Sequence, residues 1–282
     1  MDLYNQYQKK LFPYAYNILG STDDSMDAIQ DVITKYISTS KHGIENEIGY
    51  LIKGVINQSI NIKKRNQKIN GNSIWLPEPI TTEKADSNIQ REEIISYSML
   101  VLLENLNPKE RAVFILKEAF DYSHQEIADT LSFSIENSRK LLSRAKKSLD
   151  GIDINSFPSY SVTTDLLQNY IDIIKDGNVN ALEKILSEDI LVKTDGGGKV
   201  AIVSELVVGI KATIDLMLYV YDTYQKSFVI VLSTVNHQPA LLFYNDGKLV
   251  NCQIFELEKD YSKIKSIYSI VDPTKLKTKN IL

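Results

Sequence analysis

Residues 123–149 carry the pattern that most constrains the fold: two short amphipathic helices separated by a three-residue turn. Ser123 and Glu126 have the spacing of a capping box, which predicts a helix that begins directly after Ser123. The turn at 132–134 ends that helix, and apolar residues then recur every three or four positions up to Leu149. This succession predicts a helix-turn-helix, which in DNA-binding proteins places its second helix in the major groove.

The outer face of that second helix is polar and basic, as contact with base edges and phosphates requires. Its candidate DNA-binding residues are Glu136, Asn137, Arg139, Lys140 and Arg144. Two features depart from the usual motif. The turn contains no glycine, and Ser138 occupies a position of the buried stripe where an apolar residue is expected.

A second basic strip is predicted on a helix over residues 45–68, whose apolar residues form a stripe on another face. Its candidate DNA contacts are Lys53, Asn57, Asn61, Lys64 and Arg65. Lysine binds backbone phosphates and asparagine can hydrogen-bond base edges, so this face suits DNA. The net charge is −4, yet no acid lies between Lys53 and Lys68 or between Arg139 and Lys147. Such local strips attract nucleic acid whatever the total charge.

After residue 150 the pattern changes from helical to mixed. The segment 162–186 predicts two short helices and 209–221 a third, while five runs alternate as strands do. The predicted strands are 190–194, 228–234, 240–244, 249–257 and 264–271. We therefore expect an α+β module with a curved antiparallel sheet. The predicted organisation is a helical domain over 1–68, a linker over 69–90, a helical domain over 91–150 and the α+β extension over 160–282.

Two further segments stand out from their surroundings. Trp75-Leu76-Pro77-Glu78-Pro79 gives the linker an extended strip with one large apolar anchor. Asp195-Gly196-Gly197-Gly198-Lys199 permits close approach of an anion or of another backbone segment, because glycine accepts positive φ. It does not fit a phosphate-binding P-loop, since Val200 stands where that motif requires serine or threonine.

The composition narrows the function classes. One cysteine excludes a disulfide framework. The cysteine and the three histidines show none of the short paired spacings by which structural zinc sites hold four N/S ligands. We therefore expect no metal and no cofactor. The N-terminus lacks the apolar core of a secretion signal, and the apolar stretch 207–220 is interrupted by Lys211 and Asp215, so a cytoplasmic protein is predicted.

On these residues the chain resembles bacterial sigma factors of the extracytoplasmic-function group, in particular the subgroup with a SnoaL-like C-terminal extension. The resemblance implies that residues 50–65 read the −10 promoter element and that residues 106–147 form the domain that reads the −35 element. It also implies that an acidic helix over 21–40 docks on RNA polymerase. Its implied polymerase-binding residues are Asp24, Asp27, Gln30 and Asp31.

The subgroup resemblance rests on the linker strip, the triple-glycine segment and Asp272-Pro273-Thr274-Lys275-Leu276. The last is usually Asn-Pro-Asp-Lys-Leu in the subgroup, so Asp272 and Thr274 depart from it. The resemblance implies that the extension contacts the sigma domains and regulates them in place of a separate anti-sigma factor, in a monomer. The implied regulatory residues are Trp75, Leu76, Pro77, Glu78, Asp195, Gly196, Gly197, Gly198, Lys199, Asp272, Pro273 and Leu276.

The promoter reading has a geometric requirement. The DNA spacer between the −10 and −35 elements, about 17 base pairs long, spans roughly 58 Å. A linker of about 22 residues reaches roughly 73 Å when extended but only on the order of 26 Å as a relaxed coil. We therefore expect a relaxed linker and packed domains in the free protein, and an open form selected by polymerase.

Other functions remain open at this point. SnoaL-like folds elsewhere host enzymes, but no paired carboxylates or histidine share a strand face here, so we expect no enzyme. A pocket that senses a ligand without chemistry is a second alternative. A helix-turn-helix regulator that acts without polymerase is a third, although it would leave the strip at 53–68 without a partner.

Overall fold

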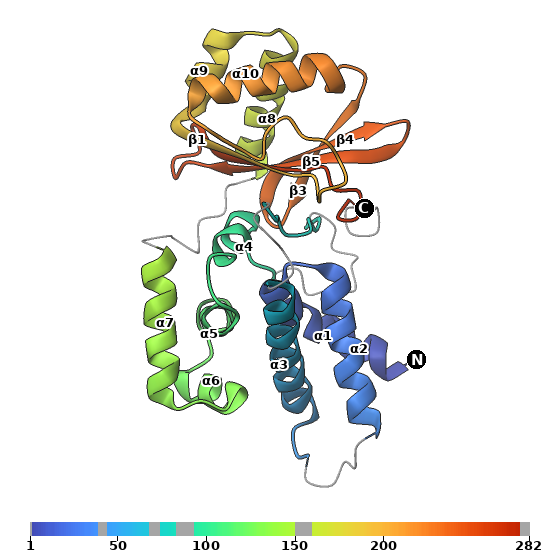
Figure 1. Cartoon of the computed structure of the whole chain (residues 1–282), viewed down its shortest axis with the longest axis vertical. Coiled ribbons are helices and arrows are strands. Elements are labelled where there is room, and N and C mark those ends of the chain that lie inside the picture. Colours follow the sequence, from blue (N-terminus) through green and yellow to red (C-terminus); the bar gives the residue numbers. More distant parts are fainter. Residues whose placement is uncertain (1, 39–43, 68–73, 83–92, 150–159, 277–282) are drawn as a thin grey trace. The chain divides into compact units, whose positions relative to one another are not determined.

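The computed structural model describes residues 2–38, 44–67, 74–82, 93–149 and 160–276 (Figure 1). The chain divides into two compact units, one of residues 1–71 and 84–154 and the other of residues 72–83 and 155–282. The linker strip therefore belongs to the C-terminal unit, although it lies between two helical segments in the sequence. The domain boundaries expected at 68/69, 90/91 and 150 fall outside the described residues.

The first unit is all α-helical. Its described helices are α1 (Asp2–Leu19), α2 (Thr22–Ser38), α3 (Glu47–Gln67), α4 (Tyr97–Leu103), α5 (Pro108–Glu118), α6 (His124–Leu131) and α7 (Ile135–Leu149). Helix α1 packs against α2 and α3 and buries Leu11, Ala15 and Tyr16. The sequence analysis did not predict α1, whose interior contains Pro13.

The helix start predicted directly after Ser123 is confirmed. The Ser123 hydroxyl accepts a hydrogen bond from the Glu126 amide at 3.2 Å, and the Glu126 carboxylate accepts one from the Ser123 amide at 2.7 Å. Asn107 and Glu110 form the same reciprocal box at the start of α5. Each box satisfies amides that the first turn of a helix leaves unpaired.

The structure also explains both departures from the usual helix-turn-helix. Ser132 ends α6 with φ 55° and ψ 47°, so it adopts the left-handed conformation in which glycine is expected. Ser138 is fully buried in α7, and its hydroxyl lies 2.9 Å from Nδ1 of His124 in α6. A polar residue fits the buried stripe because it has a polar partner there.

The second unit is a six-stranded sheet with helices on one face (Figure 1). The elements are α8 (Tyr160–Lys175), α9 (Val179–Ile185), β1 (Leu186–Asp195), β2 (Leu206–Val208), α10 (Ile210–Val220), β3 (Val229–Val235), β4 (Gln238–Asn245), β5 (Lys248–Leu257) and β6 (Ile264–Ile270). A core between helices and sheet is formed by residues such as Leu167, Leu182, Met217, Phe243 and Phe255.

The strand order is β2-β1-β6-β5-β4-β3. The pairs are antiparallel, as expected, except that β1 and β6 run parallel, which is possible because they are distant in sequence and no hairpin joins them. Strand β2 was not predicted. It has only three residues, and Leu206 and Val208 are half-exposed or more, so it carries no alternation that sequence analysis can detect.

Candidate DNA-binding surfaces and the linker-binding site

The polar face of α7 is open. Its five candidate residues, Glu136, Asn137, Arg139, Lys140 and Arg144, are all exposed. Lys140 pairs with Glu136 at 2.6 Å one turn away, but both side chains are more than half exposed. Such a surface pair contributes about 0–1 kcal/mol, so it does not prevent Lys140 from turning to another anion.

The candidate face of α3 is partly occupied. The Lys53 ammonium donates a hydrogen bond to the Asp129 carbonyl at 2.6 Å, and the Asn57 amide donates one to the Thr130 carbonyl at 3.1 Å. These carbonyls belong to the last turn of α6, where backbone acceptors lack partners within the helix and carry partial negative charge. Asn61, Lys64 and Arg65 remain exposed on the same helix.

The acidic face of α2 divides in the same way. Asp24 accepts a hydrogen bond from the side-chain amide of Asn66, and Asp31 accepts one from that of Gln58. Both donors belong to α3, and both bonds are 2.8 Å long. Burial raises the pKa of Asp24, although the Asn66 hydrogen bond acts in the opposite direction. Asp27 and Gln30 are exposed. Two of the four implied polymerase-binding residues, Asp24 and Asp31, thus bind α3 within the same unit.

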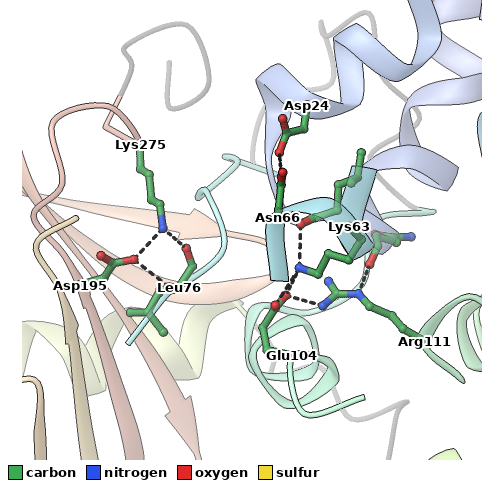
Figure 2. Close-up of polar contacts among 10 residues, drawn as sticks. Asp24, Lys63, Asn66, Leu76, Glu104, Arg111, Asp195 and Lys275 are labelled. Atoms are coloured by element: carbon green, nitrogen blue, oxygen red, sulfur yellow. Dashed lines mark hydrogen bonds and ion pairs between the residues drawn. The ribbon is translucent and has the colours of Figure 1, made fainter. Parts of the chain in front are cut away.

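A buried ionic cluster links α3 to α4 and α5 (Figure 2). The Lys63 ammonium contacts the Glu104 carboxylate at 2.7 Å and donates to the Leu19 carbonyl at 3.0 Å. Arg111, which is fully buried, pairs with the same carboxylate and donates to the Asn17 carbonyl at 3.0 Å. The cluster therefore joins α1 and α3 to the helices that follow.

Lys63 lies in the acid-free run between Lys53 and Lys68, but it does not belong to the exposed basic strip. The residue is 5% exposed. Burial and the charge of Arg111 lower the pKa of Lys63 to about 8, while Glu104 acts against them. Burial alone would raise the pKa of Glu104, but the two cations hold it below its ordinary value. No local signal marks Lys63, because its partner lies 41 positions away.

In the C-terminal unit, the linker strip is bound to the sheet (Figure 2). The Asp195 carboxylate, at the end of β1, accepts a hydrogen bond from the Leu76 amide at 2.7 Å and pairs with the Lys275 ammonium at 2.6 Å. Lys275 also donates to the Leu76 carbonyl at 2.6 Å and lies 4.3 Å from the centre of the Trp75 ring. Leu76, Asp195 and Lys275 are all buried. We call these three residues the latch.

The glycine segment supports the latch by close approach. A Cβ on Gly197 would lie 2.1 Å from the Asp272 carboxylate, and φ at Gly197 is +60°. The Gly197 amide donates to Asp195 at 2.8 Å. The anion that approaches the glycines is thus a side chain of the same unit.

Asp272 and Thr274, which depart from the subgroup pattern, are partners. The Thr274 amide and hydroxyl donate to Asp272 Oδ1 at 2.9 and 2.7 Å, and Lys199 lies 3.7 Å from the same oxygen. Burial would raise the pKa of Asp272, but these hydrogen bonds and the nearby lysines lower it below its ordinary value. Lys275, the cation of the latch, was quoted in the motif but was missed as a site residue.

The other end of the strip is held at the β3–β4 turn. Ile80 exchanges hydrogen bonds with Asn236, its amide donating to the side chain at 3.0 Å and its carbonyl accepting from the backbone at 2.8 Å. The Thr82 amide donates to the Thr234 carbonyl at 3.0 Å. The strip is therefore fixed at both ends, whereas the sequence analysis expected a relaxed linker.

Replacing Gly197 with alanine is expected to destabilise the C-terminal unit more than the same change at Gly198. Both glycines have positive φ, which costs alanine about 1–2 kcal/mol. Only Gly197 has a neighbour that a Cβ would strike, whereas nothing lies within 4 Å at Gly198. Urea unfolding of both variants measures the difference, and equal loss would contradict the close approach to Asp272.

Within the described residues, no group of three or more histidine, cysteine, aspartate or glutamate side chains could hold a metal ion. Cys252 is buried. Among the helices described, none is long and apolar enough to cross a membrane.

Residues 97–149, which include the helix-turn-helix, match the family described as sigma-70, region 4. Along 272 residues the chain is 22% identical to the probable ECF RNA polymerase sigma factor SigI of Mycobacterium tuberculosis, covering 94% of this chain and 91% of that protein. It is 24% identical over 204 residues to the ECF RNA polymerase sigma factor SigJ of the same species, covering 68% of this chain and 64% of that protein.

The crystal structure of M. tuberculosis SigJ covers 98% of this chain and 99% of its own length, with a TM-score of 0.76 at 21% identity. This likeness confirms the predicted fold class, helical sigma domains followed by an α+β extension. Residues 97–149 thus match region 4 of sigma-70 factors, and along nearly its whole length the chain is similar in sequence and in fold to RNA polymerase sigma factors of the extracytoplasmic-function group.

Proposed function

We propose that this chain is a sigma factor of the extracytoplasmic-function group with a SnoaL-like C-terminal extension. It binds core RNA polymerase and directs it to promoters, with α3 reading the −10 element and α7 reading the −35 element. The observation that carries this proposal is the pair of helical faces, each with exposed cations and amides, in a chain similar to RNA polymerase sigma factors. The exposed residues of α2, Asp27 and Gln30 foremost, provide the contact with polymerase.

We further propose that the first unit as described is a closed state. The Asn57 side-chain amide gives its hydrogens to the Lys53 and Thr130 carbonyls, so it cannot donate to a base edge while α6 is in place, and Lys53 gives one of its three ammonium hydrogens to the Asp129 carbonyl of α6. Promoter binding therefore requires that α3 and α6 separate. Core polymerase favours the open state by binding it more tightly than the closed one.

The C-terminal extension affects this opening through its contacts with the linker. Reading both promoter elements requires an extended connection, as the length of the spacer demands. While the latch holds Leu76, and Asn236 holds Ile80, residues 76–80 cannot move independently of the C-terminal unit. The C-terminal unit therefore restrains opening through its grip on the linker, which supports regulation within one chain.

Replacing Arg139 and Lys140 together with alanine is expected to weaken promoter binding by the polymerase complex about tenfold or more, because α7 loses two exposed cations. Footprinting over the −35 region measures the effect. The control is the double change Lys184→Ala and Lys211→Ala, which removes the same charge from exposed positions of the extension. Equal occupancy with both double variants would argue against α7 as the reader.

Replacing Asn61 with alanine is expected to weaken opening at the −10 element while leaving the closed state intact. Asn61 is exposed on the candidate face, unlike Asn57, which is engaged by α6. Permanganate reactivity of promoter thymines measures opening, and solution scattering measures compactness. Unchanged thymine reactivity would show that this face does not read the element.

A further inference from the structure

The C-terminal unit contains a cavity of about 280 Å³. It lies between helix α10, the loop that follows the triple glycine, and strands β1, β5 and β6. Its wall is mostly apolar and includes Ile202, Leu216, Met217, Val220, Phe228 and Val250. An apolar cavity of about 150 Å³ is enough to bind benzene, so this one has room for a molecule of about two rings.

One side of the cavity carries convergent polar groups. Asn251 and Gln253 are two positions apart on β5 and therefore face the same side, and Ser269 on β6 pairs with Gln253 in the strand register. The Ser269 hydroxyl donates to Asn251 at 3.0 Å. A small polar patch in an apolar cavity is typical of a ligand site, where it fixes the orientation of the ligand.

The acceptor of Gln253 is unpaired. Its side chain belongs to a residue that is 3% exposed, and its Oε1 atom has no hydrogen-bond partner within the described structure. A buried acceptor without a partner costs about 1–3 kcal/mol, which a donor from a bound molecule would recover. Gln253 therefore indicates what the missing partner must supply.

A rare backbone feature shapes the same wall. A π-helix at Tyr221–Gln225 directly follows α10, and Tyr224 and Gln225 from it line the cavity. Single-turn π-helices occur frequently at functional sites, because the extra residue redirects side chains. This feature is independent of the unpaired acceptor and points to the same place.

We propose that this cavity binds a neutral, largely apolar molecule of about two rings that carries one hydroxyl or N–H group, which donates a hydrogen bond to Gln253 Oε1. A charged ligand is disfavoured, because none of the described residues that line the cavity is acidic or basic and a buried charge without a partner is costly. Binding here is separate from the proposed role in transcription, since it requires only the C-terminal unit.

The position of the cavity gives a bound molecule a route to the latch. Thr194 and Val200, which line the cavity, flank the glycine segment, and Val271 precedes Asp272. The Val271 amide donates to the Asp195 carbonyl at 2.9 Å. A ligand therefore contacts the two chain segments from which Asp195 and Asp272 project.

The test uses the full chain and two probes of matched shape, 2-naphthol, which has a donor, and 2-methylnaphthalene, which has none. Calorimetric titration is expected to show that 2-naphthol binds about 5- to 10-fold more tightly, as one hydrogen bond to a buried neutral acceptor predicts. Equal affinity of the two probes, or no binding of either, would overturn the proposal.

Two variants locate the site. Gln253→Met keeps the volume but removes the acceptor, so the preference for 2-naphthol is expected to disappear. Val250→Phe fills part of the cavity and is expected to weaken the binding of both probes at least tenfold. Val231→Phe, on the exposed edge strand, is expected to leave the affinity for both probes unchanged. Unchanged affinity in Val250→Phe would place the binding elsewhere. If Gln253→Met does not fold, the comparison of the two probes on the parent chain decides.

Discussion

Replacing Lys275 with methionine is expected to release the linker strip from the C-terminal unit and to lower that unit's free energy of unfolding by about 3–5 kcal/mol. The side chains of Lys275 and Asp195 are 8% and 2% exposed, so the change leaves a buried carboxylate without its cation. It also removes the donor to the Leu76 carbonyl. Hydrogen exchange of the Leu76 amide is expected to accelerate about 100-fold or more, in line with such a loss.

The matched control is Lys265→Met, which breaks a pair with Glu256 in the same unit. Lys265 is half exposed, so its pair contributes about 0–1 kcal/mol and the linker amides should exchange as in the parent. If the extension restrains opening through the latch, the Lys275→Met variant should also stimulate more transcription than the parent does at equal polymerase concentration. Unchanged exchange at Leu76 would show that the latch does not hold the linker.

Replacing Glu104 with glutamine is expected to open the first unit. The change leaves Lys63 and Arg111 as two buried cations without a carboxylate, and breaking such a cluster costs about 3–5 kcal/mol. Because the cluster joins α3 to α4 and α5, its loss also weakens the hold of α6 on Lys53. Free protein should then bind single-stranded −10 DNA more tightly than the parent does.

The control is Asp121→Asn, which breaks a pair with Lys117 in the same unit. Asp121 is 99% exposed, so little stability should be lost. Circular dichroism separates opening from unfolding, since helix content is retained in the first case only. Retained stability in Glu104→Gln would contradict the structural role of the cluster.

The stability of the parent protein should also decrease in acid because of Glu104. Its pKa lies below the ordinary value, so the folded state holds this proton less readily than the unfolded chain does. The resulting stabilisation is present above the ordinary pKa of the group and is lost as the pH falls through its lowered folded value. Urea unfolding between pH 7 and about pH 3 should show a shallower loss in Glu104→Gln than in the parent.

Local signals in the sequence predicted local structure. The capping boxes at Asn107 and Ser123 need only residues three positions apart, and both helices begin where these pairs place them. Asn245-Asp246-Gly247 is likewise a local hairpin signal, and it lies at the β4–β5 turn, where Asp246 and Gly247 have positive φ. Periodicity also identified α3 and α7 together with their polar faces.

Contacts between distant segments were beyond such signals. Lys63 looks like its exposed neighbour Lys64 in sequence, and only the fold reveals that Glu104 faces it. Leu76 and Asp195 are 119 positions apart, so the sequence indicated two unusual segments without indicating that they bind each other. The engagement of Lys53 and Asn57 by α6 depends on backbone carbonyls, which carry no sequence signature.

The most direct test of the central claim is run-off transcription with purified core RNA polymerase and a library of promoter fragments. We expect the protein to co-elute with the core enzyme and transcripts to start at a fixed distance from a recurring pair of sequence elements. A protein that neither co-elutes with core polymerase nor stimulates any transcript would contradict it.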